Sequence, residues 1–137
     1  MASHTLMFDF RIVQSVDVQR TVHWSIGYAT RLARFFGTPQ RLASMHTIAD
    51  GLAAPFVGTH TLAHCKAFVD EWHVVPDNEI VDGMRVLMER CKLFPESAAG
   101  AAIVPLLTNR LSLSRDDVVV PIICGGNIDI ERLKQLL

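Results

Sequence analysis

The sequence lacks an excess of charge of one sign and lacks a long apolar run. Thirteen basic and fourteen acidic residues give a formal charge of -1, so we expect no basic stripe that binds a nucleic-acid backbone. The longest strongly apolar run, from Ala98 to Leu107, has ten residues and includes a glycine and a proline. A membrane helix needs about twenty apolar residues. We therefore predict that neither nucleic acid nor a membrane is a partner of this chain.

Cysteine is also scarce. Cys65, Cys91 and Cys124 are an odd number and lack the spacing of a disulfide framework, which predicts free thiols in a reducing compartment. The first residues show no basic segment followed by an apolar one, so no signal peptide is visible. Both observations predict a cytoplasmic protein.

Apolar residues, in contrast, are abundant. Half of the 137 residues are hydrophobic and only 20% are charged, which excludes a disordered chain and predicts a single domain over residues 1–137. A chain of this length buries enough surface for a core. The apolar surplus predicts elements that are buried on both faces, or a surface that meets a partner.

Strand and helix patterns alternate along the chain. Strands are predicted at Arg11–Asp17, Trp72–Val75 and Val118–Cys124. Helices are predicted at Val18–Phe36, Leu62–Val69, Ser97–Leu107 and Asn127–Leu137. A further helix is predicted to begin at Asp77, with this residue as its N-cap. This order predicts an α/β fold with a mostly parallel sheet. Pro121 removes a backbone donor, so the last strand is expected at an edge or to be irregular.

The junction Cys124-Gly-Gly-Asn127 is the most informative local feature. It follows a predicted strand and precedes a predicted helix, and ligands bind beyond the carboxyl ends of strands in open α/β sheets. Two glycines allow the backbone to approach a ligand closely, and a helix N-terminus offers free amides. Taken alone, however, a Gly-Gly pair is more often only a turn.

Other candidate residues are weaker. His60 and His64 are four residues apart and could face one metal ion, but no further ligand has a recognisable spacing, so we predict solvent-facing histidines and no metal site. Glu96 lies at a predicted helix start, where a carboxylate usually stabilises the helix. No Ser-His-Asp elbow, Walker loop or Gly-x-Gly-x-x-Gly fingerprint is present.

Several short motifs, in order, resemble the C-terminal part of the threonine/serine dehydratase family. These enzymes depend on pyridoxal phosphate, have fold type II, and are related to serine racemase and the tryptophan synthase β chain. The motifs are Thr47-Ile-Ala-Asp-Gly-Leu-Ala53, Val69-Asp-Glu71, Pro76-Asp-Asn-Glu-Ile80, Glu89-Arg-Cys-Lys-Leu93, Glu96-Ser-Ala-Ala-Gly-Ala-Ala102 and Ile123-Cys-Gly-Gly-Asn-Ile-Asp129. The resemblance covers roughly Met45 to the C-terminus, and residues 1–10 match nothing.

The resemblance implies a fold and a set of site residues. The fold is a partial three-layer sandwich with a mostly parallel sheet, the C-terminal part of a fold type II large domain. Cys124, Gly125 and Glu96 are implied as pyridoxal phosphate-binding residues, with Cys124 at the pyridine nitrogen, while no catalytic residue is implied. Asp50 matches a loop near the cleft, and Asp17 falls near a region that holds a cation in some members.

The family's Schiff-base lysine and phosphate-binding glycine loop have no counterpart here. Lys66, Lys92 and Lys134 are the three lysines, and none lies in a Ser-x-Lys-x-Arg-Gly type of motif. We therefore predict a dehydratase-like segment for hydroxy-amino-acid substrates that is inactive alone. One chain of a split dehydratase and a non-enzymatic α/β binding module are the alternatives. Apolar faces without a cover predict self-association or a complementary chain.

Overall fold

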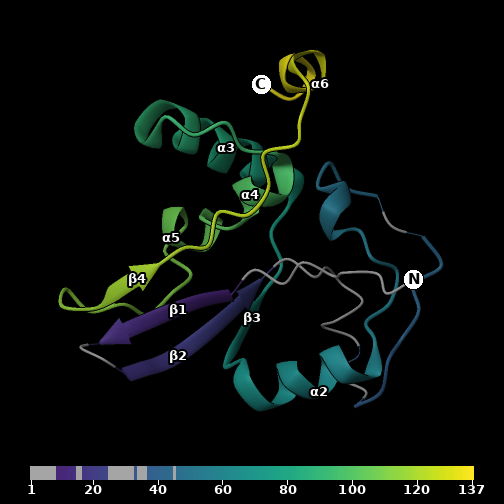
Figure 1. Cartoon of the computed structure of the whole chain (residues 1–137), viewed down its shortest axis with the longest axis vertical. Helices are drawn as coiled ribbons and strands as arrows, with labels where there is room; N and C mark the ends of the chain where they lie inside the picture. The colour runs from purple at the N-terminus through teal and green to yellow at the C-terminus, as the bar shows by residue number, and fades with distance from the viewer. Residues whose placement is uncertain (1–8, 15–16, 25–32, 34–36, 45) are drawn as a thin grey trace.

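The computed structural model describes residues 9–14, 17–24, 33, 37–44 and 46–137. Its strands form one sheet in the order β3-β2-β1-β4 (Figure 1). The strands are β1 (Asp9–Gln14), β2 (Asp17–Trp24), β3 (Glu71–His73) and β4 (Val118–Val120).

The first two strands form a hairpin. Asp9 pairs with His23 and Gln14 with Asp17, in antiparallel register. The predicted helix from Val18 is therefore wrong as far as Trp24. This segment is rich in β-branched and aromatic residues, which favour strands, and its few apolar positions fit a period of two as well as a helical period. Ala33 is helical, and the rest of that prediction lies outside the described residues.

The sheet is mixed. The β2–β3 pairing is parallel, whereas β1 is antiparallel to both β2 and β4, so the prediction of a mostly parallel sheet is wrong for the described strands. For β1 and β2 the reason is their connection, which is too short for the crossover of a dozen or more residues that parallel neighbours need. β4 is an edge strand that ends directly before Pro121, as the missing backbone donor predicts.

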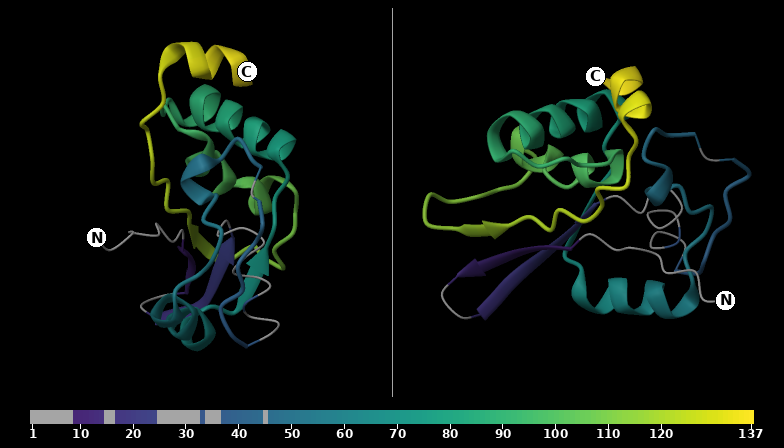
Figure 2. Two further views of the ribbon diagram at one scale, coloured as in Figure 1. Left: turned by 90° about the vertical axis from the view of Figure 1, so that its right-hand side faces the viewer. Right: turned by 45° about the horizontal axis from the view of Figure 1, so that its top comes forward.

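The helices lie on two sides of the strands. α2 (Thr59–Phe68) is on one side, and α3 (Asp77–Cys91), α4 (Ser97–Ala101) and α5 (Val104–Leu107) are on the other (Figures 1 and 2). A short 3-10 helix, η1 (Asp50–Leu52), precedes them, and α6 (Ile130–Leu136) ends the chain. None of the helices in the described ranges is both long and apolar enough to cross a membrane.

The helices predicted from Leu62 and from Asp77 are confirmed, but the single helix predicted over Ser97–Leu107 is wrong. α4 ends at Ala101 and α5 begins at Val104. In a continuous helix, the nitrogen of Pro105 would face the carbonyl of Ala101 without a proton to donate, and the proline ring would clash with it.

The core contains a close crossing of α3 and α4. An ideal Cβ on Gly83 would lie 2.3 Å from the carbonyl oxygen of Gly100, and one on Gly100 would lie 2.6 Å from Cγ of Met84. Four alanines around this crossing are almost completely buried, at 2% exposure or less: Ala98, Ala99, Ala101 and Ala102. The backbones of the two helices therefore meet at a distance that only small residues permit.

The edge strand exposes apolar side chains. Val118, Val120 and Ile122 are 54%, 47% and 41% exposed, while Val119 and Ile123 pack against the core. An uncovered apolar strand edge favours association with another chain. The self-association predicted from the sequence stays a prediction.

We expect the substitution Gly83→Ala to destabilise the fold by about 1–3 kcal/mol, the usual cost of overpacking. The new methyl group overlaps the carbonyl oxygen of Gly100, and this outweighs the gain in helix propensity. Urea unfolding followed by circular dichroism measures the effect. Glu89→Ala, at an exposed position of α3, is the control and should change stability by less than about 0.5 kcal/mol. Equal stabilities for the two variants would contradict the close crossing.

Candidate functional site

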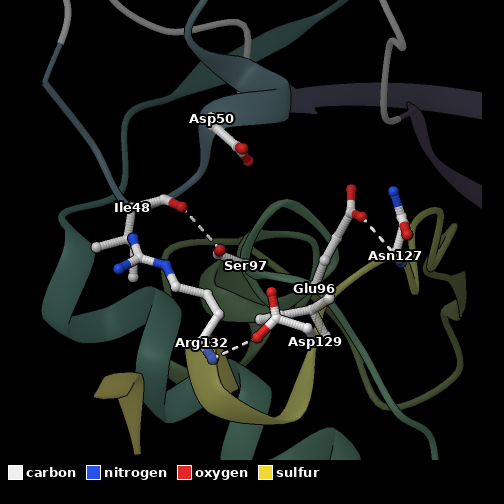
Figure 3. A pocket seen from close by; sticks show the side chains of 8 residues that line it. Ile48, Asp50, Glu96, Ser97, Asn127, Asp129 and Arg132 are labelled. Carbon is white, nitrogen blue, oxygen red and sulfur yellow. Dashed lines mark hydrogen bonds between the residues drawn. The ribbon is translucent and has the colours of Figure 1, made fainter. Parts of the chain in front are cut away.

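Three segments that are distant in sequence meet around a pocket of about 150 Å³ (Figure 3). The first enters η1, the second begins α4, and the third leads into α6. The lining residues are Ile48, Asp50, Glu96, Ser97, Asn127, Ile128, Asp129 and Arg132. Residues as far apart in the sequence as Ile48 and Arg132 thus contribute to one polar pocket.

Glu96 connects the start of α4 to the Cys124–Asn127 segment. Its backbone amide donates to the carbonyl oxygen of Gly125 at 3.2 Å, and its Oε2 accepts from the backbone amide of Asn127 at 3.1 Å. Glu96 is the N-cap residue of α4, but its side chain makes no capping hydrogen bond. The carboxylate therefore holds the glycine segment instead of its own helix, which differs from the ordinary role of a carboxylate at a helix start.

The contact between Glu96 and residue 125 requires a glycine at position 125 for two reasons. Its φ of 114° lies in the region that side chains with a Cβ rarely adopt. An ideal Cβ at this position would also lie 2.3 Å from Oε1 of Glu96. The glycine is thus more than a turn residue, because it makes room for the glutamate.

Cys124 lies beside the pocket and not among its lining residues. Its side chain is half-buried and packs against the cluster that includes Ala98 and Ala101. The structure therefore brings Glu96 and Gly125 into contact, and Cys124 is the neighbour of Gly125 in the chain.

The helix after this segment starts later than predicted. α6 begins at Ile130, not at Asn127, because Asp129 is its N-cap and accepts from the amide of Arg132 at 2.7 Å. The expectation of a helix N-terminus directly after the two glycines is wrong. Asp129 is a favourable N-cap residue, and this signal for the start of the helix was present in the sequence.

The loop on the opposite side of the pocket is held by residues that no motif in the sequence singles out as site residues. The sequence predicts Asp77 as the N-cap of α3, but Pro76 is the N-cap. The carboxylate of Asp77 accepts instead from the hydroxyl of Thr47 at 2.5 Å and from the amide of Ile48 at 3.1 Å. The hydroxyl of Ser97 donates to the carbonyl of Ile48 at 2.8 Å. A polar residue at a helix start signals a capping role, and only the fold shows that the partner is a distant loop.

The remaining candidates differ in their places. Asp50 lines the pocket and accepts from the amide of Gly51 at 2.9 Å. Asp17 begins β2, in the hairpin. His60 and His64 lie on α2, where Nδ1 of His64 is 2.9 Å from the carbonyl oxygen of His60. Across the described ranges, no cluster of three or more His, Cys, Asp and Glu residues is arranged to hold a metal ion.

All three lysines have partners elsewhere. Nζ of Lys66 donates to the carbonyl of Gly37, and Nζ of Lys92 donates to the carbonyl of Glu89, each at 2.7 Å. Lys134 pairs with Glu131 at 2.8 Å. None of the lysines lines the pocket.

Residues 21–125 match the family described as "Pyridoxal-phosphate dependent enzyme". This chain belongs to that family. It is 34% identical over 101 residues to an L-threonine ammonia-lyase of Thermotoga maritima, covering 74% of this chain and 25% of that one. It is 32% identical over 93 residues to a catabolic L-threonine dehydratase of Staphylococcus aureus, covering 66% of this chain and 27% of that one.

Solved structures support the same assignment. Maize serine racemase superposes with a TM-score of 0.67 and 28% identity, covering 82% of this chain and 36% of that one. A fungal L-serine ammonia-lyase from Rhizomucor miehei superposes with a TM-score of 0.69 and 27% identity, covering 79% of this chain and 36% of that one. The chain thus spans about a quarter of the length of these curated relatives and about a third of the length of the chains in these solved structures. The resemblance to the threonine/serine dehydratases and the partial fold type II architecture are confirmed.

Pyridoxal phosphate, which this family uses, fits the residues present only in part. Covalent chemistry on its aldehyde needs a nearby amine, and no lysine lines this pocket. Three carboxylates line it, from Asp50, Glu96 and Asp129, and they disfavour a phosphate group. The segment from Cys124 to Asn127 can meet a neutral ring edge. The lining has no amine for the aldehyde, and its guanidinium, from Arg132, is outnumbered by the three carboxylates. We therefore derive no reaction step on the cofactor from these residues.

We expect Glu96→Ala and Gly125→Ala to be strongly non-additive. Gly125→Ala alone forces the glutamate carboxylate away, whereas in the Glu96→Ala background the clash is absent and only the backbone strain remains. The coupling energy should be about 1–3 kcal/mol, as for residues in direct contact. Urea unfolding of the wild type, both single variants and the double variant measures it. Additive losses of stability would contradict the contact.

Proposed function

We propose that this chain forms one wall of the pyridoxal phosphate pocket of a threonine/serine ammonia-lyase-like enzyme. Cys124, Gly125 and Glu96 are its cofactor-facing residues, with the Cys124 thiol at the pyridine nitrogen. The observation that carries the proposal is the junction at which Glu96 binds Gly125 and the amide of Asn127. This junction joins two of the motifs that resemble the family, and it gives each of them a defined position.

A thiol at the ring nitrogen has a chemical consequence in this proposal. A neutral thiol does not hold the ring nitrogen protonated as an aspartate would, so it limits the electron withdrawal by the ring. The resemblance associates such a position with elimination from the β-carbon of a hydroxy-amino acid. The names of the relatives, which include L-threonine and L-serine ammonia-lyases, support this substrate class.

In our proposal, other polypeptide supplies the missing parts of the pocket. The three lysines are engaged elsewhere, and the pocket carries no phosphate cradle. In our proposal, the amine and the cradle lie in another segment of the same enzyme or in a separate chain. The exposed apolar edge of β4 supports a partner of this kind.

We expect the 137-residue chain alone to form no site-specific Schiff base and to produce no keto acid. The amine that would react is absent from the pocket, so pyridoxal phosphate should label lysines only at exposed positions and without selectivity. Borohydride reduction followed by peptide mass spectrometry measures the labelling, and a coupled assay with threonine or serine measures turnover. Labelling of one lysine in stoichiometric amount together with keto-acid production would overturn the proposal.

A second test addresses the wall itself. Pyridoxine phosphate lacks the aldehyde, so it reports on the ring contacts without covalent labelling. We expect its addition to shift the backbone amide resonances of Gly125, Gly126 and Asn127 in a nitrogen-15 spectrum. Cys124→Ser keeps a neutral hydrogen-bonding group and should retain these shifts, whereas Cys124→Ala should weaken binding by about fivefold, the usual effect of one lost hydrogen bond. Shifts confined to other regions would contradict the assignment of the wall.

A further inference from the structure

The backbone of Ile48 is held by side chains on both of its polar groups. Its amide donates to Oδ2 of Asp77 at 3.1 Å, and its carbonyl accepts from the Ser97 hydroxyl at 2.8 Å. The hydroxyl of Thr47 donates to Oδ1 of the same aspartate and accepts from the amide of Ala49 at 3.2 Å. We call these three side chains, Thr47, Asp77 and Ser97, the loop clamp. They fix a segment without regular structure that enters η1.

The loop clamp attaches this loop to the first residues of two helices. Asp77 is the first residue of α3, Ser97 is the first residue of α4, and neither of these helices has a side-chain capping hydrogen bond. The two helices are locked together at the crossing of Gly83 and Gly100. The loop therefore has a fixed position relative to α4 and to Glu96, the residue that precedes this helix.

The loop carries one side of the pocket. Ile48 and Asp50 line it from this loop, opposite Glu96 and Asn127 (Figure 3). A movement of Ile48 would change the separation between the carboxylates of Asp50 and Glu96, because within the described residues the Asp50 side chain is hydrogen-bonded only to its neighbour Gly51. The width of the pocket thus depends on the bonds to Ile48, together with the packing of Ala49 and Leu52 against the core.

We propose that Thr47, Asp77 and Ser97 are positioning residues that set the width of the pocket and hence its affinity for a ligand. The effect on affinity rests on the function proposed above, whereas the effect on loop geometry does not. Each of these residues acts through the loop backbone and does not itself need to touch the cofactor.

A matched pair of variants tests the clamp. Thr47→Val has nearly the same shape as threonine and removes both hydrogen bonds of the hydroxyl, whereas Thr47→Ser keeps them. Ser97→Ala removes the hydrogen bond to the carbonyl of Ile48 and is a second, independent way to free the loop from the clamp. Arg110→Ala is the stability control, because its hydrogen bonds go to the carbonyl of Val74 and to Glu79 in the first turn of α3, not to the loop.

Residual dipolar couplings of the backbone amides give the geometric readout. We expect Thr47→Val and Ser97→Ala to change the couplings of residues 48–51 and to raise the exchange rate of the Ile48 amide about tenfold, as expected when a hydrogen bond is weakened. Thr47→Ser should restore the wild-type values, and Arg110→Ala should leave them unchanged. Unchanged couplings in both clamp variants, or equal changes in the control, would overturn the inference.

Affinity for pyridoxine phosphate gives the functional readout. We expect Thr47→Val to weaken binding about fivefold, and Arg110→Ala to leave it unchanged at a similar loss of thermal stability. Equal weakening in both would show that the clamp acts only through stability and would overturn its positioning role. If the wild type binds no pyridoxine phosphate, the proposed function and the effect on affinity fail, while the couplings still decide whether the clamp positions the loop.

Discussion

The close contact between α3 and α4 determines where the residues of the candidate site lie. At Gly83 and Gly100 the two helix backbones approach so closely that a Cβ on either residue would overlap its neighbours. This contact fixes the first residues of both helices relative to one another. Asp77 at the start of α3 and Ser97 at the start of α4 can then hold the same peptide unit at Ile48. The site is thus a consequence of helix packing, although none of its residues takes part in the crossing itself.

The site residues also replace ordinary local interactions with distant ones. Asp77, Glu96 and Ser97 all lie at helix starts, where they would normally satisfy free amides of their own helix. Here each side chain instead bonds to a segment at least 29 residues away. Local capping contributes about 1 kcal/mol to a helix, so giving it up costs stability that other contacts must offset. The hydrogen bonds that replace the caps hold the segments around the pocket relative to one another.

Much of the architecture could be predicted from the sequence, and the exceptions have identifiable causes. The apolar face from Ile80 to Cys91 predicts α3, and Pro121 predicts a last strand that lies at an edge or is irregular. The hairpin was missed because Val18 to Trp24 is short and its apolar positions fit two periods. The break in the Ser97–Leu107 helix follows from Pro105, which has no proton to donate to the carbonyl of Ala101 and whose ring clashes with it.

The residues of the site were partly visible for similar reasons. Short motifs singled out Glu96 and Gly125, and their contact explains why both residue types are needed. The loop clamp could not be predicted, because the partner of Asp77 lies 29 or more residues away and a helix-start aspartate ordinarily caps its own helix. Such pairings depend on the distance between two helices, and no pattern within either segment encodes that distance.

The charges around the pocket constrain how a cofactor could meet this wall. Asp50, Glu96 and Asp129 bring three carboxylates to it, and Arg132 brings one guanidinium, so the lining has more negative than positive groups. A phosphate dianion close to these carboxylates would be repelled, and the repulsion is stronger at a partly desolvated site than in water. In the proposed pocket, the phosphate must therefore lie on the side away from this chain, with only the ring edge near Cys124. This orientation requires that the phosphate cradle and the reactive amine both come from the opposite wall, which agrees with their joint absence here.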